Sequence, residues 1–310
     1  MNNSSETDRR KDFFEEVVFK NLTVVLFGII INAINSLLVF TFVRTPSLRS
    51  ESRYILYMQL VFNDIIMLSV SVALHVLGYT VRDLNVIVCC ILILIANNVH
   101  KNMPLNLAGM ALERFVAVCY PLHHSLICTV QRTKMLIAII WCLGALPGVI
   151  DLLITLALRP LSFFTAGRLC YHANIFSLKY NIDNNLASNI SHLCFVWVTL
   201  FYTYFRVLFS AKAAASDPVK AQKAQRTILL HGIQLVLCMT SYVTPIVEAT
   251  LIVLFPDYRS VILFCNYIIS SILPRLLSPL IYGLRDQTFK KHLEGLVLCR
   301  LIKGSVDPTV

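Results

Sequence analysis

The chain has 310 residues, of which 57% are hydrophobic and only 14% are charged, and its mean hydropathy is +0.70. This composition excludes a single large soluble domain, which would need more polar residues to cover its core. The formal net charge of +10 does not require a nucleic-acid partner, because basic residues beside membrane-spanning helices face anionic lipid. We therefore expect a protein that crosses a membrane several times and has lipid as a partner.

Seven apolar runs are long enough to cross a bilayer, since a spanning helix needs about 20 residues. In chain order they are Leu22–Val43, Tyr54–Tyr79, Val86–Val118, Met135–Leu158, Leu186–Ser210, Thr227–Leu254 and Val261–Leu284. A short amphipathic helix at Arg285–Leu298 follows, of the kind that lies along a membrane surface. The pattern predicts an all-α membrane protein with a tail (1–21), a seven-helix bundle (22–284), a membrane-surface helix (285–298) and a cytoplasmic tail (299–310).

The distribution of Lys and Arg predicts the orientation of the bundle. Fifteen of them lie in or beside the segments that follow helices one, three, five and seven, and nine lie on the other side. The positive-inside rule therefore places the N-terminus outside and the C-terminus inside. Glycosylation sequons at Asn2 and Asn3 suit an outside tail. Residues 1–20 lack the apolar core of a cleavable signal, so helix one would act as its own insertion signal.

Charged residues inside the apolar runs are the first candidates for function, because burying each in a membrane costs about 3 kcal/mol or more. Asp64 is the lone charge of the second run. The third run carries Lys101 near its middle and the adjacent pair Glu113 and Arg114 near its end. We expect this pair to face the cytosolic mouth of the bundle. The alternative is a structural surface pair, which would contribute little to stability.

The stretch Met110–Ser125, around Glu113 and Arg114, resembles the signature that ends the third helix in rhodopsin-like G-protein-coupled receptors, and within them the odorant-receptor branch. Matching residues are spread over nearly the whole chain. They are Asn35, Asp64 and Trp141 in helices one, two and four, Tyr204 in helix five, Lys223, Ala224, Thr227 and His231 at the start of helix six, and Pro274 with Ser278–Tyr282 in helix seven. The resemblance implies a plasma-membrane receptor, not an enzyme, that binds a small-molecule odorant inside the bundle. Its partner would be a heterotrimeric G protein of the stimulatory type, which raises cyclic AMP.

The resemblance also assigns two functional regions. The ligand pocket would lie between the outer halves of helices three, five, six and seven, with Asn97, His100, Lys101, Thr244, Glu248 and Asn266. The G-protein-coupling residues would be Glu113, Arg114, Tyr204, Lys223, His231 and Tyr282, with Glu113 restraining Arg114 in the resting state. Lys101 has three open interpretations: it faces the pocket or an internal water cluster, it belongs to a structural pair, or it is a neutral buried amine.

The bundle would also contain a polar core formed by Asn35, Asp64, Arg275 and Ser278. In most receptors of this class the acid of helix two helps to bind a sodium ion, but Met103 and Arg275 stand at positions that would complete that site. We therefore predict a direct or water-bridged pair of Asp64 and Arg275. The alternative is that Arg275 points elsewhere and that burial keeps Asp64 protonated.

Two cysteines are expected to face an oxidising compartment, where disulfides form. The family spacing to Arg114 favours a disulfide between Cys89 and Cys170, with Cys90 as the competitor for Cys89. Cys299, just beyond the membrane-surface helix, is a candidate for palmitoylation or an unmodified thiol.

Several departures from the odorant-receptor pattern suggest a divergent branch, of the fish type. The chain has Glu113-Arg114-Phe115 where Asp-Arg-Tyr is usual, and Met239 where an aromatic residue is expected. Three other classes remain as alternatives: a transporter, a membrane enzyme and a non-odorant receptor of the same class. A transporter would be expected to show paired repeats, and the sequence has none. A membrane enzyme would need a cluster such as His-x-x-x-His or Glu-x-x-His, and the predicted helices contain neither. We expect no cofactor and no metal, and no sequence feature decides for or against dimerisation.

Overall fold

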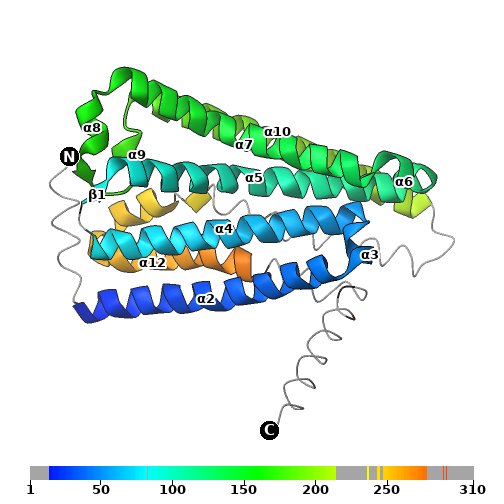
Figure 1. Ribbon diagram of the computed structural model, residues 1–310, viewed down its shortest axis with the longest axis horizontal. Helices are drawn as coiled ribbons and strands as arrows, with labels where there is room; N and C mark the ends of the chain where they lie inside the picture. The colour runs from blue at the N-terminus through cyan, green and yellow to red at the C-terminus, as the bar shows by residue number, and fades with distance from the viewer. Residues whose placement is uncertain are drawn as a thin grey trace, which may run out of the picture.

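The computed structural model describes residues 14–81, 83–213, 236, 243–244, 247–277, 289 and 291. Within these residues six helical segments are long and apolar enough to cross a membrane. They are α2 (Phe14–Arg44), α4 (Ser52–Thr80), α5 (Val86–Cys119), α7 (Val130–Leu158), α10 (Lys179–Ala213) and a final segment made of η2 (Pro256–Tyr258), α12 (Arg259–Tyr267), the π-helix η3 (Ile268–Ile272) and helical residues 273–277. Figure 1 shows these segments running side by side along the long axis of the molecule.

The helices follow the predicted runs in order, and three of the α-helices begin five or more residues earlier than predicted. The first is α2, which begins at Phe14, eight residues before Leu22. The same shift is five residues at α7 and seven at α10. The cause is that hydropathy marks the apolar part of a helix, whereas its first turn depends on capping and polar contacts. At α7, for example, the Thr129 side chain accepts a hydrogen bond from the Arg132 backbone N–H.

Parts of the expected helix six, residues 236, 243–244 and 247–254, are helical. The remainder of that helix and most of the expected membrane-surface helix lie outside the described residues. Also outside them are seven candidate site residues: Asn2, Asn3, Lys223, His231, Ser278, Tyr282 and Cys299.

The centre of the bundle is α5, which contacts α4, α7 and α10 (Figure 1). Residues 101–110 of α5 are all buried, because neighbouring helices cover this stretch on every face. On its α4 side Met103, Leu107 and Met110 join a cluster of buried apolar side chains. By contrast, large apolar side chains on the outer faces of α2, α7 and α10 are exposed, as expected for surfaces that contact lipid.

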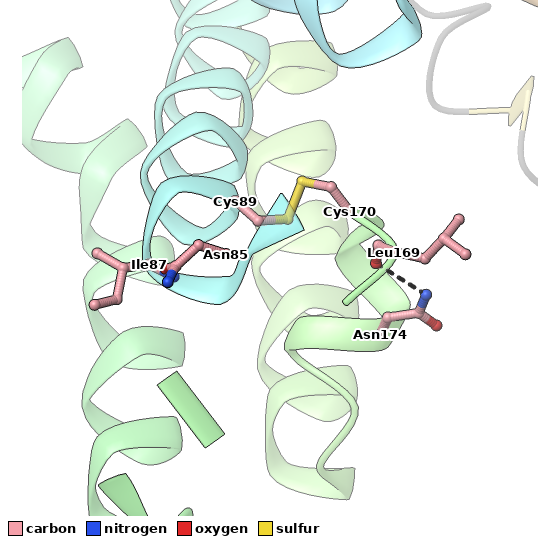
Figure 2. Close-up of a disulfide and its surroundings, with 6 residues drawn as sticks. All are labelled: Asn85, Ile87, Cys89, Leu169, Cys170 and Asn174. Atoms are coloured by element: carbon pink, nitrogen blue, oxygen red, sulfur yellow. Dashed lines mark hydrogen bonds between the residues drawn. A yellow bond between two sulfur atoms is a disulfide. The ribbon is translucent and has the colours of Figure 1, made fainter. Parts of the chain in front are cut away.

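One end of the bundle, here named the disulfide end, carries a disulfide between Cys89 of α5 and Cys170 (Figure 2). This confirms the pairing implied by the family resemblance, and Cys90 is a free, buried thiol. A small antiparallel sheet, which the sequence patterns do not reveal, adds a second tether: β1 (Leu84–Asn85) pairs with β2 (Gly167–Arg168). Together they hold the segment that contains α8 (Leu161–Thr165) and α9 (His172–Ile175) against the start of α5.

The opposite end, here named the Arg114 end, carries three short elements. They are α3 (Pro46–Arg49), η1 (Pro121–His123) and α6 (His124–Ile127). Pro46 and Pro121 each occupy the first turn of their element, where a missing backbone N–H costs no helical hydrogen bond. These turns connect the long helices and shape the surface around Arg114.

The disulfide yields a testable prediction. Cys89→Ser and Cys170→Ser should each destabilise the folded chain by about 2 to 4 kcal/mol and reduce its delivery to the cell surface, because the loop at this end loses its covalent tether. The double variant should be no worse than either single variant, and Cys142→Ser, which changes a free exposed thiol, serves as the control. Surface labelling of expressing cells measures the effect, and additive losses would contradict the pairing.

Candidate functional site

The predicted polar core contains a buried ion pair. The Nε atom of Arg275 lies 3.9 Å from Oδ1 of Asp64, and the two side chains are 2% and 1% exposed. Arg275 also donates through Nη1 to the backbone oxygens of Ser270 and Ser271, at 2.8 and 3.1 Å. Both acceptors belong to the π-helix η3, where the wider turn changes the usual hydrogen-bond ladder. The Arg275 guanidinium therefore contacts both the Asp64 carboxylate of α4 and the backbone carbonyls one turn earlier in the final helical segment.

The structure thus brings Asp64 and Arg275 together, as the sequence predicts. Asn35, also assigned to the polar core, is fully buried on α2. Neither atom of its amide has a hydrogen-bond partner among the described residues.

The buried pair yields a second prediction. Asp64→Asn and Arg275→Met should each destabilise the chain by about 3 to 5 kcal/mol, because each leaves one buried charge without its partner. The double variant that combines Asp64→Asn with Arg275→Met should recover part of that loss, since no uncompensated charge remains. As a control, Glu51→Gln breaks the exposed pair with Arg53 and should cost less than about 1 kcal/mol. Thermal unfolding of the purified variants measures these effects, and independent, additive losses would show that the pair is not coupled.

At the Arg114 end, Glu113 has two partners. Its carboxylate lies 3.8 Å from Nε of Arg114 and makes a closer contact, 2.9 Å, with Nε2 of His124 in α6. Glu113 is 6% exposed, whereas Arg114 is 36% exposed. The predicted contact between Glu113 and Arg114 is present, and His124 is a second partner of Glu113 that the sequence motifs do not reveal.

A cleft of about 510 Å³ opens beside this group. Its walls come from α5, from the start of α4 with the residues just before it, from α6 and from the turn that leads into α7. They include Glu51, Arg53, Glu113, Arg114, His124 and Cys128. Burial raises the pKa of the Cys128 thiol, and the nearby negative charge of Glu113 raises it further, so this thiol stays protonated at neutral pH. Tyr204, another predicted coupling residue, lies on α10 with its side chain exposed and its ring packed edge-on against Phe205.

The six predicted pocket residues separate into two groups. In the first, the Asn266 amide of α12 donates to Glu248 Oε2 at 2.9 Å and to the Thr244 backbone oxygen at 3.5 Å. The second group lies on α5 and consists of Asn97, His100 and Lys101. Lys101 is fully buried and donates to the hydroxyl of Ser188 on α10. The structure therefore favours the interpretation of Lys101 as part of a polar contact between α5 and α10.

Several buried polar side chains of α7 and α10 lie near Ser188, and the sequence analysis does not predict them as a site. Asp151 of α7 is 1% exposed, and its Oδ1 accepts a hydrogen bond from Asn184 of α10 at 2.9 Å. Asn181, one turn earlier on α10, donates to the Thr155 hydroxyl at 2.8 Å. Two signals could have revealed this group: a carboxylate inside an apolar run, and three polar residues of α10 at positions 181, 184 and 188, which share one helical face.

A smaller cavity of about 340 Å³ lies at the disulfide end, between α9 and α10. Its lining includes the apolar side chains Phe176, Ile182 and Leu186 and the polar side chains His172 and Asn189. Burial is the main cause that lowers the pKa of His172, so its imidazole is neutral at pH 7. Across the described residues, no group of three or more His, Cys, Asp or Glu side chains is placed to hold a metal ion.

Comparisons with known proteins agree with this architecture. Residues 34–282 match the family model for the seven-transmembrane receptors of the rhodopsin family. The chain is 31% identical over 306 residues to "Odorant receptor 131-2" of Danio rerio, a match that covers 96% of this chain and 92% of the relative. It is 24% identical to the human "Olfactory receptor 51F2", covering 87% of this chain and 80% of the relative. Its match to the human "Olfactory receptor 51T1" is 26% identical and covers 62% and 59%, respectively.

Proposed function

The chain belongs to the rhodopsin family of seven-transmembrane receptors, and we propose that it acts as an odorant receptor that signals through a stimulatory heterotrimeric G protein. The observation that carries this proposal is the similarity to a zebrafish odorant receptor over nearly the full length of both chains. Membership of the family confirms the predicted seven-helix bundle and makes the chain a multi-pass membrane protein.

The proposed orientation places the N-terminus and the disulfide end outside the cell. Figure 1 shows that α2 begins at the same end of the bundle as β1, beside the disulfide. Disulfides form and persist in oxidising compartments, which supports this orientation. The sequons at Asn2 and Asn3 would then be available for glycosylation, and Cys299 would lie on the cytosolic side as a candidate for palmitoylation.

The Arg114 end then faces the cytosol, and we assign G-protein coupling to it. The partly exposed guanidinium of Arg114 borders a cleft of about 510 Å³ at this end of the bundle. In the resting state Glu113 lies beside Arg114 and is also held by His124. Activation would separate Arg114 from Glu113, while His124 keeps the buried carboxylate hydrogen-bonded and so lowers the cost of the separation.

The odorant would bind in the half of the bundle nearer the disulfide end, where the predicted pocket residues lie. Cyclic-AMP measurements test this proposal. Cells that express the full chain, with its surface level checked by labelling, should respond to at least one class among small acids, amines, aldehydes, alcohols and steroids. A chain that reaches the surface and responds to none of them would contradict the proposal.

Arg114 provides the sharpest test of coupling. Arg114→Ala should abolish the agonist-driven rise in cyclic AMP and leave surface expression intact, because the side chain is partly exposed and supports little of the packing. Lys134→Ala, which removes an exposed basic residue at the same end of the bundle, is the matched control and should keep most of the response. Normal signalling by Arg114→Ala would show that this guanidinium does not contact the G protein.

A further inference from the structure

His124 lines the cleft at the Arg114 end and contacts the buried carboxylate of Glu113. Its Nε2 atom lies 2.9 Å from Oε1 of Glu113, and its side chain is 32% exposed, whereas that of Glu113 is 6% exposed. An ionised carboxylate can only accept hydrogen bonds, so Nε2 of the imidazole must be the donor. The histidine therefore combines a contact to a buried charge with direct access to water.

The second ring nitrogen of His124 can gain a proton without breaking this contact. Within the described part of the chain, the ring makes its hydrogen bond through Nε2, which leaves Nδ1 available to a proton from solvent. Histidine ordinarily changes its charge between about pH 5 and pH 8. Protonation would convert the neutral donor into a cation and the contact with Glu113 into a stronger, charge-assisted hydrogen bond.

Arg114 is held to the same carboxylate by charge alone. Its Nε atom lies 3.8 Å from Oε2 of Glu113, beyond the length of a hydrogen bond, and its side chain is 36% exposed. An attraction of this kind depends directly on the net charge that the guanidinium meets. A positive charge on His124 would balance the Glu113 carboxylate and repel Arg114, so the attraction that holds Arg114 would weaken.

The other charged groups around His124 have partners of their own. Glu51 and Arg53, at the start of α4, form an ion pair at 2.6 Å. Arg132, at the start of α7, donates to two backbone oxygens of α6 at 3.0 and 3.5 Å. The Cys128 thiol stays protonated at neutral pH, because burial and then a nearby carboxylate raise its pKa. Within the described lining of the cleft, histidine is thus the side-chain type that ordinarily titrates near neutral pH.

We propose that His124 is a positioning residue that sets how tightly the resting chain holds Arg114, and that cytosolic protons act on G-protein coupling through it. This inference rests on the proposed function, because it names a regulator of the same coupling site. At alkaline pH the neutral imidazole leaves the negative charge of Glu113 to Arg114. As the pH falls through the histidine range, the imidazolium balances that charge and frees the guanidinium for the G protein. Acidification should therefore increase coupling, and by linkage the coupled state binds the proton more tightly.

Nucleotide exchange on a purified stimulatory G protein, with the full chain in lipid vesicles and no agonist, tests the proposal. Glu113→Gln removes the charge that holds Arg114, so its exchange rate at each pH is the reference that cancels the pH dependence of the G protein itself. Relative to that reference, exchange by the unmodified chain should rise about twofold or more between about pH 7.5 and about pH 6.5. Equal ratios at the two pH values would overturn the proposal.

Substitutions at position 124 separate the charge of the side chain from its shape. His124→Gln keeps a neutral donor, so exchange should stay at the low, alkaline level at both pH values. His124→Arg carries a permanent positive charge and should give the high, acid level at both. His123→Gln changes the adjacent histidine, which is exposed on η1, and is the matched control that should keep the full pH dependence. A pH dependence that persists in His124→Gln, or that disappears in His123→Gln, would overturn the proposal.

Thermal unfolding tests the charge pair without a G protein. Glu113→Gln, His124→Gln and the double variant form a cycle, in which the non-additive part of the shifts in unfolding midpoint reports the contact between the two side chains. This part should be larger at about pH 6.5 than at about pH 7.5, by about 1 °C or more, because an imidazolium binds a carboxylate more strongly than a neutral imidazole does. An equal non-additive part at both pH values would contradict the charge switch.

The exchange measurements also separate this inference from the proposed function. No exchange by any of these chains at either pH, Glu113→Gln included, would contradict the proposed function and the inference together. Exchange by the unmodified chain that is independent of pH would leave the receptor function standing and overturn only the role of His124.

Discussion

The complete burial of residues 101–110 is the constraint on which the bundle depends, because a helix enclosed on every face fixes the positions of all its neighbours. In lipid, apolar side chains alone give helices little reason to associate, so close packing and polar contacts between helices carry the specificity. On α5 both are present. Asn106 donates to the Leu56 backbone oxygen of α4 at 3.0 Å. One turn earlier, Asn102 occupies the space beside Gly144 of α7, where any larger residue would collide with it.

The central helix also separates two buried charge systems. Lys101 points to Ser188 on α10, whereas the adjacent His100 lies within electrostatic range of Arg275 in the final segment. Successive residues of a helix differ by about 100° in direction, so these neighbouring positions face different helices of the bundle. The packing around α5 therefore bears on the contact of Lys101 with α10 and on the surroundings of Arg275 at the same time.

Hydropathy predicts the six spanning helices found among the described residues, and the family resemblance pairs Cys89 with Cys170. The pairing of Asp64 with Arg275 follows from a departure from the family pattern, since Arg275 stands where a sodium site would be completed. The missed features share one physical cause: an average over a segment does not show which face a side chain occupies. Asp151 lies in a strongly apolar run, and its importance depends on the polar face of α10 opposite it. His124 reaches Glu113 only because η1 and α6 turn the chain back towards α5, and no local pattern encodes that return.

The disulfide and the contact of Lys101 with Ser188 are linked because Cys89 and Lys101 both lie on α5. Twelve residues separate Cys89 from Lys101, which corresponds to about 18 Å along a helix, and α9 begins two residues after Cys170. The covalent bond and the β1–β2 pairing therefore fix His172 relative to Lys101 through one rigid helix. The side of the 340 Å³ cavity that includes His172 and Phe176 therefore belongs to the segment that the disulfide tethers, whereas its other side, with Ile182 and Asn189, belongs to α10. Loss of the disulfide would release only the first of these two sides, because α10 is held to α5 by its own contacts.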